Sequence, residues 1–126
     1  MTRKALETPH APRAIGAYSQ AIHVGNLVFI SGQIPLSPQT MEIVGSDIRA
    51  QVTQVFENLK AIALAAGATL GHAAKLTVYL TDLANFATLN EVMADYFSAP
   101  FPARATVQIA ALPRGALVEV DAILSL

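Results

Sequence analysis

The stretch Pro102-Ala103-Arg104-Ala105-Thr106-Val107 marks the point where a predicted helix ends and a predicted strand begins. Pro100 and Pro102 end the helix, because proline cannot donate the backbone hydrogen bond that a helix interior needs. From Arg104 to Ala110 polar and apolar side chains alternate, which is typical of a β-strand. Arginine is rarely buried without a partner, since taking its charge out of water is costly. A fold that buries this strand must therefore supply a counter-charge for Arg104.

Two explanations for Arg104 stay open from the residues alone. The last predicted strand, Leu117 to Leu124, carries Glu119 and Asp121 on one face, and these acids could neutralise the guanidinium. In the other explanation the guanidinium holds an anionic ligand, because a charge kept in an apolar setting needs a counter-charge. The first explanation makes Arg104 a structural residue, and the second makes it a functional one.

The turn Leu112-Pro113-Arg114-Gly115 predicts a hairpin between the last two strands. In that register Thr106 lies opposite Asp121. Arg104 and Glu119 share the same face but are two pair-steps apart, which is far for a salt bridge within one chain. A neighbouring subunit could close that gap.

The clearest helix is predicted from Asp47 to Ala66, where apolar residues recur at three- and four-residue steps and form one stripe. Ser46 is its expected N-cap, and Gly67 is expected to follow it in the left-handed conformation. A second helix is predicted after a cap at Asp82 or Asn85, ending at about residue 98. The remaining elements are strands at 17–24, 27–32 and 74–80.

This order of elements predicts a two-layer α+β fold, with two helices packed on one face of a mixed β-sheet. The other face, carrying Arg104, Thr106 and Glu119, would be left open and is best buried against copies of the same chain. Residues 1–13 contain prolines and scattered polar groups, and they predict an irregular N-terminal arm. The chain as a whole, 1–126, is expected to form a single domain.

Composition limits the partners of this chain. Apolar residues make up 53% and charged residues only 13%, a surplus of apolar surface that predicts an obligate oligomer. The net charge of −1 and the lack of a basic run argue against nucleic acid. No signal peptide and no membrane-spanning helix are predicted. Without cysteine, disulfides and thiolate metal sites are excluded, and a reducing cytoplasm is compatible; the three histidines have no spacing suited to a metal.

Four ordered blocks of this sequence resemble those of the RidA (YjgF) family, the reactive intermediate deaminases. The resemblance covers nearly the whole chain, and its most specific part is the C-terminal block. The blocks are Ile15–Ala21, Phe29–Pro35, Asp82–Asn90, and Pro102–Val107 followed by Leu112 and Val118-Glu119-Val120.

The resemblance implies a chorismate-mutase-like α+β domain that assembles as a homotrimer with clefts between subunits. It also implies hydrolysis of small 2-imino acids, such as 2-iminobutanoate and 2-iminopropanoate, to 2-oxo acids and ammonia, without metal or cofactor. Arg104 would hold the substrate carboxylate with its guanidinium fork. Glu119 would orient or deprotonate the attacking water. The residues expected to bind substrate are Tyr18, Ser31, Gly32, Asn90 and Thr106.

Thr106 departs from the family pattern, because many members carry cysteine at this position. Activity is expected to survive, since imine hydrolysis needs no thiol nucleophile. Three other functions stay open: a regulatory module that binds small 2-oxo acids or related carboxylates without turnover, an endoribonuclease or translation inhibitor, a description often attached to this family, and, by analogy of fold alone, a chorismate mutase. The binding module differs from the deaminase only in its kinetics. The small number of lysines and arginines argues against the endoribonuclease.

Overall fold

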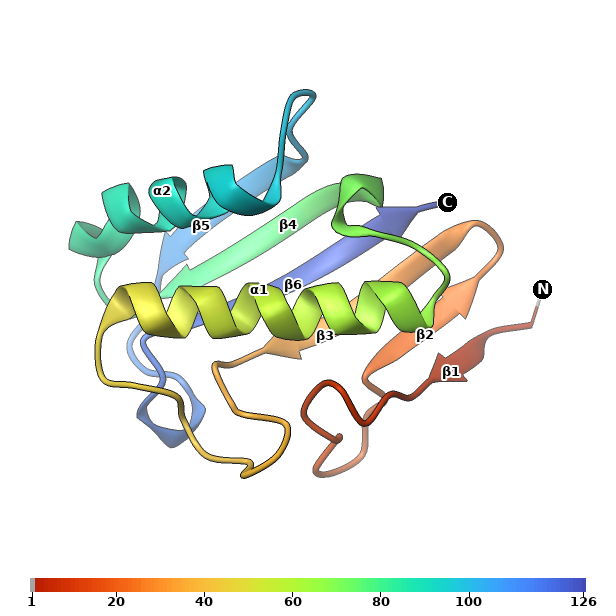
Figure 1. Ribbon diagram of the computed structural model, residues 1–126, viewed down its shortest axis with the longest axis horizontal. Helices are drawn as coiled ribbons and strands as arrows, with labels where there is room; N and C mark the ends of the chain where they lie inside the picture. The colour runs from red at the N-terminus through yellow and green to blue at the C-terminus, as the bar shows by residue number, and fades with distance from the viewer. Residues whose placement is uncertain (1) are drawn as a thin grey trace.

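Buried and more exposed side chains alternate along the three longest strands of a six-stranded mixed sheet, which has both helices on one face (Figure 1). The computed structural model describes residues 2–126. The strands follow the order β1-β2-β3-β6-β4-β5 across the sheet, which confirms the predicted two-layer α+β fold. The elements are β1 (Lys4–Leu6), β2 (Ala21–Val24), β3 (Leu27–Gln33), α1 (Ile48–Ala65), β4 (Ala73–Leu80), α2 (Phe86–Tyr96), β5 (Ala103–Gln108) and β6 (Val118–Ser125).

The hydrophobic core lies between the sheet and the helices. β4 and β6 pair antiparallel at the centre of the sheet, so that Val78 lies opposite Val120, and both are fully buried. The apolar stripe of α1 packs on this surface through side chains such as Phe56 and Leu59, which are also fully buried. Burying a side chain of this size contributes about 1.5–3 kcal/mol, so the core stabilises the two layers as one unit.

The ends of α1 are set by a side-chain cap and a glycine. Oδ1 of Asp47 accepts a hydrogen bond from the backbone N–H of Ala50 at 2.7 Å, which makes Asp47 the N-cap. The prediction of Ser46 as the cap is wrong by one residue, because the carboxylate of Asp47 reaches this N–H. The predicted end is confirmed, since Gly67 has a φ of 75°, the left-handed conformation that follows a helix.

The second helix is shorter than predicted. A 3₁₀ turn at Leu83–Asn85 precedes α2, and Oδ1 of Asp82 accepts a hydrogen bond from Ala84 N–H at the start of that turn. The helix proper ends at Tyr96, after which the chain is extended. Within residues 2–126, neither helix combines the length and the apolar character that a membrane-spanning segment requires.

β5 lies at the edge of the sheet and pairs parallel with β4, whereas β6 pairs with the other side of β4. The predicted hairpin between the last two strands is therefore wrong: Thr106 lies opposite Val78, and Asp121 lies opposite Thr77. The reason is the connection through α2, since a helix between two strands normally returns the chain to form a parallel pair. The segment after β5, which includes a 3₁₀ turn at Pro113–Gly115, then carries the chain to the opposite side of β4.

The parallel register also decides which face each candidate side chain occupies, because paired residues share a face. Arg104 pairs with Leu76, which is buried beneath the helices, and Thr106 lies on that same side. Glu119 pairs with Tyr79 on the open face. The prediction that Arg104, Thr106 and Glu119 share the open face is therefore wrong, since it depended on the hairpin register.

The N-terminal arm is tied to the sheet by a strand and by a buried amide. Lys4–Leu6 pair with β2, so the arm is not irregular throughout as predicted, and β2 begins at Ala21, later than predicted. Gln20 is 4% exposed. Its side chain accepts a hydrogen bond from Thr8 N–H and donates one to the carbonyl of Pro12, each at 2.8 Å. This amide fixes the path of the loop that leads to the candidate site.

Candidate active site

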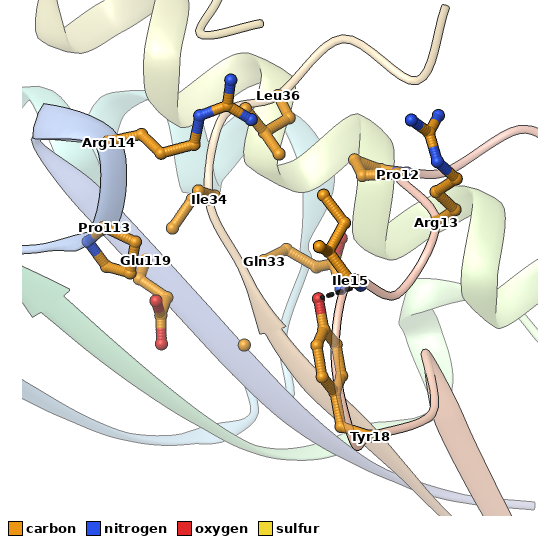
Figure 2. A pocket seen from close by; sticks show the side chains of 11 residues that line it. Pro12, Arg13, Ile15, Tyr18, Gln33, Ile34, Leu36, Pro113, Arg114 and Glu119 are labelled. Carbon is orange, nitrogen blue, oxygen red and sulfur yellow. Dashed lines mark hydrogen bonds between the residues drawn. The ribbon is translucent and has the colours of Figure 1, made fainter. Parts of the chain in front are cut away.

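A pocket of about 410 Å³ opens where three segments meet: the loop at 12–18, the end of β3, and the turn that leads into β6 (Figure 2). The loop is held by Gln20, and β3 and β6 are neighbouring strands. Three residues predicted for the site line this pocket, namely Tyr18, Gly32 and Glu119. The fold therefore brings these three together within one chain.

Gly32 leaves room for the carboxyl group of Glu119. A Cβ at position 32 would lie 2.4 Å from Oε2 and 2.9 Å from Cδ of Glu119, well inside van der Waals contact. The register of β3 against β6 shifts between Ile30 and Gln33, which places Gly32 in a β-bulge. The bulge and the missing side chain together let the carboxyl lie close to the backbone of β3.

The surroundings of Glu119 favour its protonated form. Burial raises the pKa of this half-buried carboxyl, and the negative charge of Asp121 raises the pKa further. Asp121 accepts a hydrogen bond from the hydroxyl of Tyr79 at 3.2 Å on the same face. A carboxyl whose pKa lies closer to neutrality is better suited to accept a proton from water than an ordinary exposed one.

Tyr18 and Ser31 make backbone contacts that order the loop beside the pocket. The hydroxyl of Tyr18 accepts a hydrogen bond from Ile15 N–H at 3.2 Å, and the ring is 52% exposed, so it is accessible to a ligand. Oγ of Ser31 donates to the carbonyl of Ser19 at 2.6 Å. Ser31 does not line the pocket, and its hydroxyl joins β3 to the loop.

The guanidinium of Arg104 is held by uncharged groups. Its Nη1 donates to Oδ1 of Asn90 at 2.7 Å and lies 3.2 Å from Sδ of Met93. Its Cζ is 5.1 Å from the centroid of the Phe86 ring, a cation–π contact. Within residues 2–126 no carboxylate lies within salt-bridge distance of Arg104. The acids of β6 occupy the other face of the sheet, so within one chain they do not neutralise Arg104.

Arg104 and Asn90 line a second pocket, of about 450 Å³, between α2 and the start of β5. Thr106 follows on the same side of β5, and its Oγ1 is buried without a hydrogen-bond partner among residues 2–126. Leaving a buried hydroxyl unpaired costs about 1–3 kcal/mol. The second pocket has no lining residue in common with the pocket beside Glu119.

The predicted site is thus divided into two half-sites. The acidic half-site contains Glu119, Gly32 and Tyr18, and the cationic half-site contains Arg104 and Asn90. Three contributors were missed by the sequence analysis: the anchoring amide of Gln20, and the side chains of Arg13 and Arg114, which line the acidic half-site. The turn at Leu112–Gly115 was the available signal for Arg114, and none of the patterns in the sequence points to Arg13.

These features define an α+β domain with two separate pockets, one beside Arg104 and one beside Glu119 that Arg13 and Arg114 also line. The chain belongs to the endoribonuclease L-PSP family, whose model matches residues 8–125. Among curated relatives, DfrA of Myxococcus xanthus is 54% identical over 98% of this chain and 95% of its own. A 2-iminobutanoate/2-iminopropanoate deaminase of Dermatophagoides farinae is 42% identical over 96% of this chain and 94% of its own.

Solved structures agree with this family assignment. RidA from the Antarctic bacterium Psychrobacter sp. PAMC 21119 superposes with a TM-score of 0.95 at 52% identity, covering 98% of this chain and 99% of that one. Escherichia coli TdcF, crystallised with bound serine, gives a TM-score of 0.93 at 46% identity, covering 98% of each chain. The resemblance to the RidA family is confirmed, and reactive intermediate deaminases are among the relatives of this chain.

Proposed function

We propose that this protein hydrolyses small 2-imino acids, such as 2-iminobutanoate and 2-iminopropanoate, to 2-oxo acids and ammonia without metal or cofactor. The observation that carries the proposal is the exposed guanidinium of Arg104, which has no acid partner within residues 2–126. A planar guanidinium can bind a carboxylate through two parallel hydrogen bonds. The relative from Dermatophagoides farinae that is named for this reaction supports the choice of substrate.

The proposed site is completed between copies of the chain. Arg104 and Glu119 lie on opposite faces of one sheet, so a single chain cannot bring both to one small substrate. The open face exposes apolar side chains, among them Phe29 at 42% and Val107 at 41%, which a second copy would cover. We infer a homotrimer, the assembly that the resemblance implies, in which Arg104 of one subunit faces Glu119 of the next.

The reaction requires the substrate and the attacking water to be held in position more than it requires the substrate to be activated, because C2 of an iminium is already electrophilic. Arg104 would hold the carboxylate, and Asn90 would orient the guanidinium. Glu119 would accept a proton from water as the water oxygen bonds to C2. The nitrogen would then take that proton, the C2–N bond would break to release ammonia, and the remaining hydroxyl would lose its proton to solvent to give the 2-oxo acid. Of the other predicted residues, Tyr18 and Gly32 would line the cleft beside Glu119, Ser31 would order the adjoining loop, and Thr106 would lie on the same side of β5 as Arg104.

The test is the rate of ammonia release from 2-iminobutanoate generated in place by a flavin amino-acid oxidase. The wild-type protein should accelerate release, and Arg104→Ala should lower kcat/KM about 10- to 100-fold, the effect of losing a charged hydrogen-bond partner. Arg104→Lys should recover only part, since an ammonium lacks the planar fork. Arg49→Ala removes an exposed arginine that pairs with Glu91 and should leave the rate unchanged. No acceleration by the wild-type protein would disprove the proposal.

A carboxylate-binding module without turnover is the second candidate. The serine bound by TdcF favours it, because that relative holds a small carboxylate-bearing molecule. Binding of 2-oxobutanoate, measured by calorimetry, would depend on Arg104 in both cases. Tight binding without any gain in rate would establish the module in place of the enzyme.

Endoribonuclease activity is the third candidate, because the family description names it. The sequence has 8 lysines and arginines against 9 acids, which provides few cations for phosphates. RNA binding that falls steeply with salt would be its mark. The proposal also places the protein in the cytoplasm, a reducing compartment with which a cysteine-free sequence is compatible.

A further inference from the structure

The acidic half-site also contains two cations that the proposed reaction does not use. Arg13 and Arg114 line the same pocket as Glu119. Neither arginine forms an ion pair within residues 2–126. The salt bridge found in this part of the chain joins Arg49 to Glu91. With two guanidinium groups and one carboxyl whose pKa is raised, the pocket carries a net positive charge.

The guanidinium of Arg114 is positioned rather than loose. Its Nη1 donates to the carbonyl of Met41 at 2.9 Å, which leaves its other N–H groups available to a ligand. Arg114 has a φ of 59°, and so does Met41. The left-handed conformation costs a non-glycine residue roughly 1–2 kcal/mol. Two such residues joined by one hydrogen bond indicate that the fold holds this cation in place against a backbone cost.

The shape of the pocket separates its charges. In Figure 2 the guanidinium groups of Arg114 and Arg13 lie apart from each other, one beside Leu36 and one beside Pro12, and the carboxyl of Glu119 points away from both. Apolar side chains, including Ile34 and Leu36, line the space between these groups. A ligand that spans the pocket should therefore have a polar centre at one end, a short apolar middle, and an anionic group at the other end.

The volume of the pocket also favours a ligand larger than the smallest imino acids. 2-Iminobutanoate has about seven heavy atoms, and because bonded atoms take less room than the ~30 Å³ share of a liquid water, it occupies less than about 200 Å³. The pocket measures about 410 Å³ in one chain. A molecule of that size would leave more than about half of the space in one chain empty.

We propose that the preferred substrates are 2-imino acids with an acidic side chain, the imines of aspartate and glutamate, whose second carboxylate is bound by Arg13 and Arg114. This inference rests on the proposed deaminase function. The imine carbon would lie near Glu119, and the first carboxylate would be held by Arg104 of the adjoining subunit. Arg13 and Arg114 act as specificity residues, because they distinguish an acidic side chain from an apolar one.

The test compares two imines formed by amino-acid oxidases, one from glutamate and one from 2-aminobutanoate. The wild-type protein should prefer the acidic imine by about tenfold in kcat/KM, the effect of one charge-assisted contact. The variant Arg13→Gln with Arg114→Gln should lose that preference. The control Arg3→Gln removes the same charge from an exposed position that lines neither half-site, and it should keep the preference.

Several results would overturn the inference. The wild-type protein could show no preference, the double variant could lose both substrates equally, or Arg3→Gln could have the same effect as the double variant. The single variant Arg13→Gln guards against misfolding, since Arg13, unlike Arg114, has no bond to Met41. It should lose part of the preference on its own.

A binding measurement separates this inference from the proposed function. If the wild-type protein hydrolyses neither imine, the deaminase proposal fails, and the affinities for 2-oxoglutarate and 2-oxobutanoate then decide the role of the arginines. About tenfold tighter binding of 2-oxoglutarate, lost in the double variant, would support the dicarboxylate site. Equal affinities would reject it, whatever the rates show.

Discussion

The glycine at position 32 is the smallest feature on which the proposed activity depends. In Gly32→Ala the new Cβ would lie 2.4 Å from Oε2 of Glu119, so the carboxyl must move. Because that carboxyl ends a flexible side chain, the free energy of unfolding should fall by no more than about 1 kcal/mol. Misplacing a reacting group by 1 Å can cost about 100-fold, so kcat/KM should fall by about that factor.

Gly71→Ala is the matched control for this substitution. Gly71 borders neither half-site, and its Cβ would meet only Oγ1 of Thr69, at 3.2 Å. Urea unfolding and imine kinetics would be measured on both variants. Full activity in Gly32→Ala would mean that the position of the Glu119 carboxyl does not matter to the reaction.

The pKa of Glu119 determines the expected pH dependence. Burial, and then the charge of Asp121, raise this pKa above the ordinary value of 4.5. Glu119 must be ionised to act as a base, so kcat/KM should fall as the pH drops through the raised pKa. Asp121→Asn removes a nearby negative charge, lowers the pKa of Glu119, and should move this acid limb to lower pH. The same limb in Glu119→Gln would show that a different group titrates.

Several residues that line the two pockets were predicted from the sequence, but their arrangement was not. Alternation along a strand shows that Arg104 and Thr106 share a face, but it cannot show which side of the sheet that face is. A register shift of one residue moves every side chain of a strand to the opposite side. Arg13 and Arg114 lie in loops, where side chains follow no period, so their convergence on one pocket was not predictable from spacing.

At the scale of the elements, the N-cap of α1 gives a prediction about stability. Asp47→Ala leaves the N–H of Ala50 without its 2.7 Å partner and should lower the free energy of unfolding by about 1 kcal/mol. Ser46→Ala should change it by less than about 0.5 kcal/mol, because Ser46 does not cap the helix. Both are measured by urea unfolding at one protein concentration, since self-association stabilises the folded state. A larger effect at Ser46 would contradict the observed cap.

The strand order shows which sequence signals were decisive and which were overlooked. The two helices and the strands at β3, β4 and β6 follow from periodicity, because each buries one regular apolar face. The position of β5 does not, since a turn near Leu112–Gly115 resembles a hairpin whether or not its flanking strands pair. Two signals favoured the observed order: a helix between β4 and β5 predicts a parallel pair, and the polar Arg104 and Gln108 suit an edge strand.

At the scale of the whole molecule, the divided site predicts complementation between impaired variants. Arg104→Ala alone should show the loss of about 10- to 100-fold in kcat/KM given above, and Glu119→Gln alone should also be impaired. After unfolding together and reassembly, random mixing should place an intact Arg104 beside an intact Glu119 in about a quarter of the clefts of a cyclic oligomer. Ammonia release should therefore recover to about a quarter of the wild-type rate.

The control for this experiment is the doubly substituted chain, mixed with either single variant. Such mixtures contain no cleft with both groups intact and should show no recovery above the single variants. If the first mixture shows no recovery, both groups act within one chain. That result would contradict a site formed between chains, which was inferred because Arg104 and Glu119 lie on opposite faces of the sheet.

Arg104 and Glu119 lie on opposite sides of one sheet, and this placement has a consequence for the regulation of such a protein in a cell. A newly made chain would be chemically silent, because it holds two incompatible halves and no finished cleft. Near the concentration at which subunits associate, the total rate of hydrolysis would then rise more steeply than the protein concentration. Dilution below that concentration would abolish activity. Turnover per molecule, followed over a dilution series, would show that threshold directly.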